Sequence, residues 1–261
     1  MTAAPVLRVE ALTRVFGGLT AANAVDLSVG TGEIVGLIGP NGAGKTTVFN
    51  MIAGAFPPTS GRVLVDGRDC TGLPAHRMAA LGVARTFQIT AVFNGHTVLE
   101  NVRIGTHRRF RSGFLGALVG AAGWRADERR AEEAAREILA FLDMERLSGE
   151  DAQSLPYGDQ RRLEIAIALA ADPRLLLLDE PAAGMNPDEA RRLIRTIGRI
   201  RERGVSVLLV EHHMRVVMGV CDRIAVLDHG VKIAEGPPAA VANDPEVIRV
   251  YLGREAVHAP A

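Results

Sequence analysis

The sequence predicts an α/β fold in which a mostly parallel sheet forms the core, an antiparallel β flank lies beside it, and an α-helical subdomain is inserted. Short apolar runs alternate with longer helical patterns, which favours a parallel sheet covered by helices. The runs at 34–38 and 175–178 are apolar at nearly every position, as is typical of strands buried on both faces. Residues 7–10 alternate apolar and polar side chains, which predicts a strand with one solvated face and hence the antiparallel flank.

The strands are predicted, in chain order, at residues 7–12, 24–29, 34–38, 62–65, 175–178, 205–210 and 223–227. Asp228-His229-Gly230 predicts a tight hairpin turn near the end of the sheet. Residues 128–142 have an apolar helical face, and no strand pattern occurs between 105 and 154. We therefore predict an α/β core at 1–96 and 163–236, a helical subdomain at 97–162 and a C-terminal tail at 237–261.

Charge and cysteine content narrow the classes of function. The 261 residues include 30 Lys plus Arg and 30 Asp plus Glu, so no net field favours nucleic acid as a partner. Cys70 and Cys221 are the only cysteines and lack metal-ligand spacing, which predicts buried thiols in a reducing cytosol. The first residues lack the basic and apolar regions of a secretory leader.

One apolar stretch, at 114–124, follows a group of arginines. It is shorter than the roughly 20 residues that a membrane-spanning helix needs. Two interpretations stay open: a helix–loop segment packed inside the helical subdomain, or a surface near a membrane partner.

A glycine-rich motif follows the buried run at 34–38 and precedes a predicted helix at 45–53. It fits the pattern GxxxxGK[ST] and reads Gly39-Pro40-Asn41-Gly42-Ala43-Gly44-Lys45-Thr46. Glycines allow a tight turn and let backbone N–H groups face a phosphate, while the helix start adds partial positive charge. We expect Lys45 to bridge the β- and γ-phosphates, Thr46 to bind Mg²⁺ and Thr47 to support the phosphate contacts. The predicted core is therefore that of a P-loop NTPase.

Two carboxylates, Asp179 and Glu180, end the buried run at 175–178. Ligands of open α/β sheets collect at the carboxyl ends of strands. We expect Asp179 to hold Mg²⁺, directly or through water, and Glu180 to orient or deprotonate the attacking water. Phosphoryl transfer depends mainly on positioning and charge neutralisation, so a metal and one well-placed carboxylate suit that chemistry.

The segment Leu155-Pro156-Tyr157-Gly158-Asp159-Gln160 resembles the signature of the ABC ATPases, usually Leu-Ser-Gly-Gly-Gln. The order of phosphate loop, Gln88, signature, acidic pair and His212 resembles that family over nearly the whole chain. The resemblance implies that backbone N–H groups around Tyr157 and Gly158 bind the ATP of an opposite subunit. ATP would then be sandwiched between two chains, and closure would complete the catalytic site.

The same resemblance implies further roles. Phe16 matches the aromatic residue that stacks on adenine, Gln88 the glutamine that touches Mg²⁺ and water, and His212 the histidine that senses the γ-phosphate. An imidazole in that place donates to developing phosphate charge. Several positions depart from the family pattern: Pro156 replaces a serine, Asp159 a glutamine, Asn186 an aspartate and His213 an aspartate.

Within this family, the chain resembles the Liv G-type ATPases of branched-chain amino acid importers. The matching runs lie at 85–88, 97–102, 160–166, 179–187 and 247–253. The resemblance implies ATP hydrolysis coupled to uptake of branched-chain or related small amino acids. It also implies an F-type ATPase partner (with a homodimer left open), two permease subunits, a periplasmic or extracellular binding protein, and a peripheral place on the cytoplasmic face of the inner membrane.

The identity of the transported solute is implied by the family resemblance alone, because none of these residues is expected to contact the solute. Urea, amides and other small hydrophobic acids stay open as solutes. Two other classes are weighed: a soluble ABC protein acting on nucleic acid or ribosomes, and a lipopolysaccharide-type exporter ATPase. The first usually has two fused cassettes or a coiled-coil insertion and a basic stripe, which this sequence lacks.

Overall fold

The computed structural model describes residues 4–86, 92–109 and 122–255. The chain divides into two compact units, Met1–Val83 with Arg174–Ala261, and Ala84–Pro173. The segment 97–162, which the sequence predicts as the helical subdomain, lies within the second unit. Across the described ranges, no helix combines the length and the apolarity that crossing a membrane requires. The stretch at 114–124 falls almost entirely outside the described residues.

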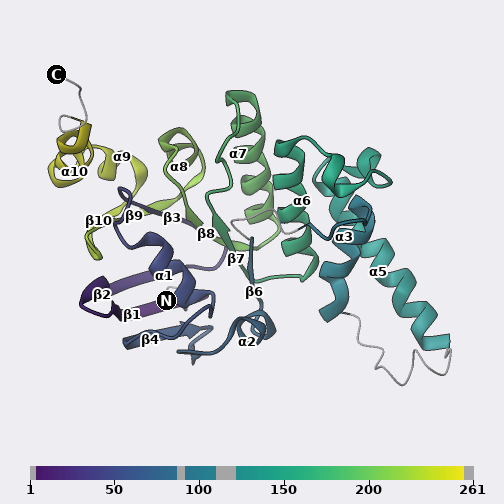
Figure 1. The fold of residues 1–261 in the computed structure, drawn as a ribbon, viewed down its shortest axis with the longest axis horizontal. Coiled ribbons are helices and arrows are strands. Elements are labelled where there is room, and N and C mark those ends of the chain that lie inside the picture. The colour runs from purple at the N-terminus through teal and green to yellow at the C-terminus, as the bar shows by residue number, and fades with distance from the viewer. Residues whose placement is uncertain (1–3, 87–91, 110–121, 256–261) are drawn as a thin grey trace. The chain divides into compact units, whose positions relative to one another are not determined.

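A six-stranded sheet organises the first unit, with strand order β10-β9-β3-β8-β7-β6 (Figure 1). Its parallel centre consists of β3 (Ile34–Ile38), β7 (Leu175–Asp179), β8 (Ser206–Val210) and β9 (Arg223–Asp228). Every residue of β3, β7 and β8 is buried, as the continuous apolar runs predict. At the edges lie β6 (Val83–Arg85) and β10 (Val231–Gly236), which the sequence analysis did not define as strands.

A separate antiparallel sheet forms the flank, in the order β2-β1-β4-β5. Its strands are β1 (Leu7–Phe16), β2 (Leu19–Val29), β4 (Ser60–Val65) and β5 (Arg68–Asp69). The antiparallel flank is therefore confirmed, but it contains four strands in a sheet of its own. Both β1 and β2 are longer than predicted, because bulges at Ala11 and Ala24, where φ is 46° and 48°, interrupt the alternation without ending the strand.

Helices of the first unit follow the strands. They are α1 (Lys45–Ile52), α2 (Ala75–Ala80), α7 (Pro187–Glu202), α8 (Met214–Val220), α9 (Pro238–Ala242) and α10 (Pro245–Glu255). Helix α7 begins with a capping box: the Asn186 side chain accepts from the Glu189 backbone N–H, and the Glu189 side chain accepts from that of Asn186. The start of α7 after the acidic strand end is thereby fixed by local sequence.

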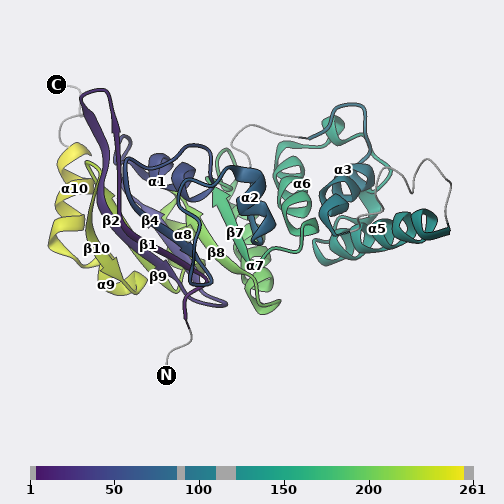
Figure 2. The ribbon, with the colours of Figure 1, turned by 90° about the horizontal axis from the view of Figure 1, so that it is seen from below.

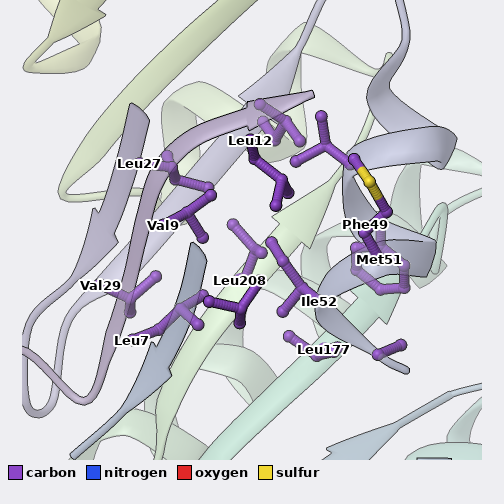
Figure 3. Packing of buried hydrophobic residues seen from close by; sticks show 14 of the residues in the cluster. Leu7, Val9, Leu12, Leu27, Val29, Phe49, Met51, Ile52, Leu177 and Leu208 are labelled. Atoms are coloured by element: carbon purple, nitrogen blue, oxygen red, sulfur yellow. The ribbon is translucent and has the colours of Figure 1, made fainter. Parts of the chain in front are cut away.

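The core of this unit joins the two sheets through α1. In Figure 3, Leu7, Val9 and Leu12 of β1 and Leu27 and Val29 of β2 face Phe49, Met51 and Ile52 of α1, beside Leu177 and Leu208 of the central sheet. All of these side chains are at least 97% buried. Burial of a large apolar side chain contributes about 1.5–3 kcal/mol, so this cluster anchors α1, and with it the loop that precedes α1.

The two cysteines are buried and free, as predicted. Burial raises the pKa of the Cys70 thiol to about 11 and that of Cys221 to about 12. Both thiols therefore stay protonated and unreactive near neutral pH.

The second unit is built around α3 (Val98–Gly105), α5 (Ala122–Phe141) and α6 (Tyr157–Ala170), with single turns at Thr106–Arg108, Glu145–Leu147 and Ala152–Ser154 (Figure 2). Helix α3 contacts both α5 and α6. A capping box between Thr97 and Glu100 starts α3. The fully buried Asn101 side chain bonds backbone groups of Phe93, His96 and Thr97, which ties the preceding segment to this helix.

Candidate nucleotide-binding site

The phosphate loop connects the buried strand β3 to α1, as the sequence predicts. Gly39, Gly42 and Gly44 have φ values of 149°, 81° and 96°, in the region that favours glycine. A Cβ atom on Gly39 would lie 2.1 Å from the Leu227 carbonyl oxygen, and one on Gly44 would lie 2.3 Å from that of Ala21. The loop therefore packs against β9 and β2 so closely that only glycine fits at these two positions.

Lys45 begins α1 and is 6% exposed. Its Nζ atom donates to the carbonyl oxygens of Gly39 at 2.7 Å and Pro40 at 3.0 Å. The ammonium group thus lies over the loop, at a helix N-terminus whose first turn has no acidic residue. Fixed positive charge and helix N–H groups in one place form a site suited to polyanionic phosphate.

An open cavity of about 560 Å³ adjoins the loop. The phosphate loop contributes its residues from Asn41 to Thr47, and the end of β7 contributes Glu180. The remaining lining residues are Phe16, Leu19, Thr20, Ala21, His229 and Gly230. Two further loop residues, Gly39 and Pro40, lie beneath the Lys45 ammonium. The structure therefore brings the predicted phosphate, adenine and water-activating residues of this unit to one cavity.

Phe16 presents a partly exposed ring at the edge of the cavity, 42% of the residue being accessible. The Arg14 guanidinium lies 4.6 Å from the centre of this ring and 5.1 Å from that of Phe56. Phe56 meets Phe16 edge to face, with ring centres 5.6 Å apart. Arg14 is held in turn by a 2.7 Å hydrogen bond to the Pro57 carbonyl. Cation–π and aromatic contacts therefore support a ring placed to stack on a planar base.

The acidic pair lies at the end of β7. Asp179 is 3% exposed, and Thr46 of the phosphate loop lines the cavity. A buried carboxylate and a hydroxyl are hard oxygen ligands of the kind that Mg²⁺ prefers, so their chemistry suits the predicted metal, but only Thr46 of the two lines the cavity. Glu180 adopts the left-handed region at φ 46°, and its N–H donates to the Val210 carbonyl at 2.8 Å. Such backbone strain in a residue with a side chain is typical of functional sites.

His212 follows β8 and approaches the acidic pair. Its Nδ1 atom lies 3.8 Å from Glu180 Oε1, and its side chain is about half exposed. Fully buried Glu211 fixes this arrangement: Oε1 accepts from the Ala182 N–H at 2.8 Å, and Oε2 accepts from the His212 and His213 N–H groups at 2.8 and 2.9 Å. The loops after β7 and β8 are thereby joined through one carboxylate.

The segment resembling the signature lies in the second unit. Pro156 is the N-cap residue of α6, just before the helix, with φ −53° and ψ 149°, so an extended residue stands where the serine is usual. Tyr157 and Gly158 form the first turn, where helix N–H groups lack intrahelical acceptors. The Asp159 carboxylate accepts from Arg162 Nη1 at 2.8 Å, which offsets its negative charge beside the predicted anion site.

Comparisons with known proteins agree with this geometry. A sequence model described as "ABC transporter" matches residues 22–183, more than half of the chain. The chain belongs to the ABC transporter ATP-binding cassette family. A second model, described as "Branched-chain amino acid ATP-binding cassette transporter", matches residues 231–257. The predicted family and ATPase class of this cassette are thereby confirmed.

Known relatives align with the cassette over nearly its whole length. It is 44% identical to the high-affinity branched-chain amino acid transport ATP-binding protein BraF of Pseudomonas aeruginosa, over 95% of this chain and 98% of BraF. It is 43% identical to LivG of Escherichia coli K12, with the same coverage. Among solved structures, the ADP conformation of the ABC cassette MJ1267 matches with a TM-score of 0.83 and 32% identity, over 96% of this chain and 99% of that one.

Several residues of the cassette's site were missed by sequence reasoning. Arg14 and Phe56 contact the Phe16 ring, and His229 lines the cavity from the hairpin turn. Glu211 had a weak signal, since it is a carboxylate directly after a fully apolar strand. Gln88, predicted to touch Mg²⁺ and water, lies outside the described residues.

Proposed function

We propose that the chain is the ATP-hydrolysing subunit of an ABC importer for branched-chain or related small amino acids. One observation carries the ATPase part: the phosphate loop, the Phe16 ring and the Glu180 carboxylate line a single cavity. The importer part is supported by the branched-chain transporter model that matches residues 231–257 and by the names of BraF and LivG. The solute itself is taken from these relatives.

The proposal gives each predicted site residue a role. Phe16 stacks on adenine, and the loop N–H groups with Lys45 and Thr47 hold the phosphates. Thr46, Asp179 and Gln88 would hold Mg²⁺, which neutralises phosphate charge when bound. Glu180 orients the attacking water and accepts its proton, and His212 donates to the charge that develops on the γ-phosphate. The 3.8 Å distance between His212 Nδ1 and Glu180 Oε1 suits two groups that act on neighbouring atoms.

The proposed partners of this cassette come from its family. Tyr157 and Gly158 would bind the nucleotide held by a second ATPase subunit, either an F-type partner or a second copy. Two permease subunits and a periplasmic or extracellular binding protein complete the transporter, with the cassette peripheral on the cytoplasmic face of the inner membrane. Nucleic acid is not a proposed partner, since acidic and basic residues balance at 30 each.

Co-expression with the permease and ATPase genes beside its own tests the proposal. The complex, reconstituted in proteoliposomes with Mg-ATP and the binding protein, should take up radiolabelled leucine and lose uptake with the Glu180→Gln subunit. Uptake of urea or amides instead would correct the solute. Extraction of lipopolysaccharide from the vesicles would replace the importer by an exporter, and an absence of Mg-ATP hydrolysis would reject the ATPase itself.

A further inference from the structure

His229 lies at the tip of the hairpin between β9 and β10, far in sequence from the nucleotide motifs, yet it lines the nucleotide cavity. Its side chain is about four-fifths exposed, and its nearest charged neighbour is Asp228, with Nε2 3.8 Å from Oδ1. An imidazole donates and accepts hydrogen bonds and has a flat face. The residue therefore has both the place and the chemistry to contact a bound molecule.

The hairpin turn that carries His229 is fixed to the site. The Gly230 N–H donates to the carbonyl of Ala43 in the phosphate loop at 3.0 Å, and the Gly230 carbonyl accepts from the Asn23 N–H at 2.8 Å. His229 and Gly230 have φ values of 45° and 82°, as a two-residue type I′ turn requires. The turn thus holds the imidazole at a defined place beside the loop.

The turn packs on the side of the cavity where the base is expected. A Cβ atom on Gly230 would lie 3.1 Å from the Ala21 carbonyl oxygen and 3.2 Å from Ala22 Cα. Ala21 lines the cavity in the same stretch of β2 as Leu19 and Thr20, shortly after the Phe16 ring. His229 therefore borders the cavity between the phosphate loop and the stretch of β2 that follows Phe16.

We infer that His229 is a nucleotide-contacting residue, whose imidazole bonds the nucleoside half of ATP from the side of the hairpin. The inference rests on the proposed ATP site and adds a residue outside the motifs that define it. A single hydrogen bond of this kind changes affinity by about three- to tenfold. Because the contact is to the nucleoside, ATP and ADP should be affected alike.

His229→Asn is the informative variant, because asparagine favours the left-handed conformation of this turn but is shorter and lacks the imidazole Nε2. The control is His76→Asn, which changes an exposed histidine of α2 that lies outside the cavity lining. Equilibrium titration with Mg-ATP and Mg-ADP, and competition by inorganic triphosphate, separates a nucleoside contact from a phosphate contact.

We expect His229→Asn to weaken ATP and ADP binding by the same factor, about three- to tenfold, with triphosphate binding and the His76→Asn protein unchanged. Wild-type affinity for ATP in His229→Asn would overturn the inference and leave the ATP site standing. An equal loss of triphosphate affinity would overturn the nucleoside assignment. Failure of the wild-type chain to bind ATP would instead reject the proposed function.

Discussion

At the scale of single residues, Glu180 combines the features expected of a catalytic carboxylate. It lines the cavity, and its backbone is held in the left-handed region at φ 46° by the bond from its N–H to the Val210 carbonyl. Strain of this kind costs about 1–3 kcal/mol and persists where the surroundings over-determine it. This backbone conformation lets the Glu180 side chain line the cavity at the end of β7, whereas the neighbouring Asp179 is buried.

Glu180→Gln should therefore keep Mg-ATP affinity within about twofold while lowering turnover by at least about a hundredfold, because the amide cannot accept the water proton. Single-turnover hydrolysis beside equilibrium titration measures the two effects. Glu202→Gln, at an exposed position in α7, is the control for loss of one acidic group. Turnover close to wild type would remove Glu180 from the mechanism.

Arg14 supports the ring of Phe16, the residue proposed to stack on adenine. Its guanidinium contacts the rings of both Phe16 and Phe56 and is anchored to the Pro57 carbonyl. Arg14→Met keeps the apolar stem but removes the cation–π contacts, which are worth about 0.5–1 kcal/mol. We expect ATP affinity to fall about two- to fivefold in calorimetric titration, with Arg68→Met on exposed β5 unchanged. Equal affinity in both variants would contradict this role.

The proposed catalytic residues could be named from the sequence because each motif is contiguous and carries its own structural context. Lys45 and Glu180 each follow a buried strand, and the ends of neighbouring parallel strands meet. Arg14, Phe56 and His229 could not be predicted as site residues, since the fold brings Arg14 and Phe56 to the Phe16 ring and hairpin docking brings His229 to the cavity. Glu211 shows the intermediate case: its position after β8 was visible, but its role required the Ala182 N–H from another loop.

At the scale of elements, predictability followed length and periodicity. The buried strands β3, β7 and β8 were found because every position is apolar. Strands β5 and β6 were missed because two and three residues show no alternation. Helix α5 starts at Ala122, six residues before the predicted start at 128, because its first turns lack the apolar face that defined the prediction. Local sequence patterns therefore predict buried core strands better than short edge strands and helix ends.

One connection between elements gives a pH-dependent prediction. Glu33, between β2 and β3, accepts from Arg223 Nε and Nη2 of β9 at 2.9 and 3.0 Å and from the Gly30 N–H at 2.6 Å. Burial raises the pKa of this carboxyl, but the hydrogen bonds from Arg223 and Gly30 lower it overall, below its ordinary value of 4.5. The stabilisation is therefore present above that value and is lost as the pH falls through the lower, folded-state pKa.

Glu33→Gln should lower the free energy of unfolding by about 1 kcal/mol at neutral pH, discounted for partial exposure of the pair. The difference from wild type should narrow as the pH falls from 4.5 through the lower, folded-state pKa, because the wild-type carboxylate becomes protonated over that range. Urea unfolding at pH values on both sides of that range measures the effect. A difference independent of pH would show that lost packing, and not the charge, accounts for the change.

At the scale of the whole molecule, the two units divide the chemistry. The first unit holds the nucleotide cavity, and the second presents the start of α6, where Tyr157 and Gly158 form the first turn. The proposed mechanism needs the α6 start of one chain at the nucleotide of another. Binding by the isolated chain and assembly with a partner are therefore separable properties.

Pro156→Ser separates them. Serine can adopt the extended backbone conformation of Pro156. As an N-cap residue it should stabilise α6 by about 1 kcal/mol, and its hydroxyl adds a hydrogen-bond donor for the partner's nucleotide. Both proteins should also carry Glu180→Gln. Pro156→Ser should then leave the Mg-ATP affinity of the isolated subunit constant and raise its ATP-dependent association constant about two- to fivefold. Analytical ultracentrifugation, of the subunit alone or with its partner ATPase, measures the association. Pro74→Ser is the matched control, because Pro74 is likewise the N-cap residue of a helix, α2, and has a similar extended backbone, with φ −69° and ψ 157°. An equal gain in association for both variants would trace the effect to helix capping and remove α6 from the shared site.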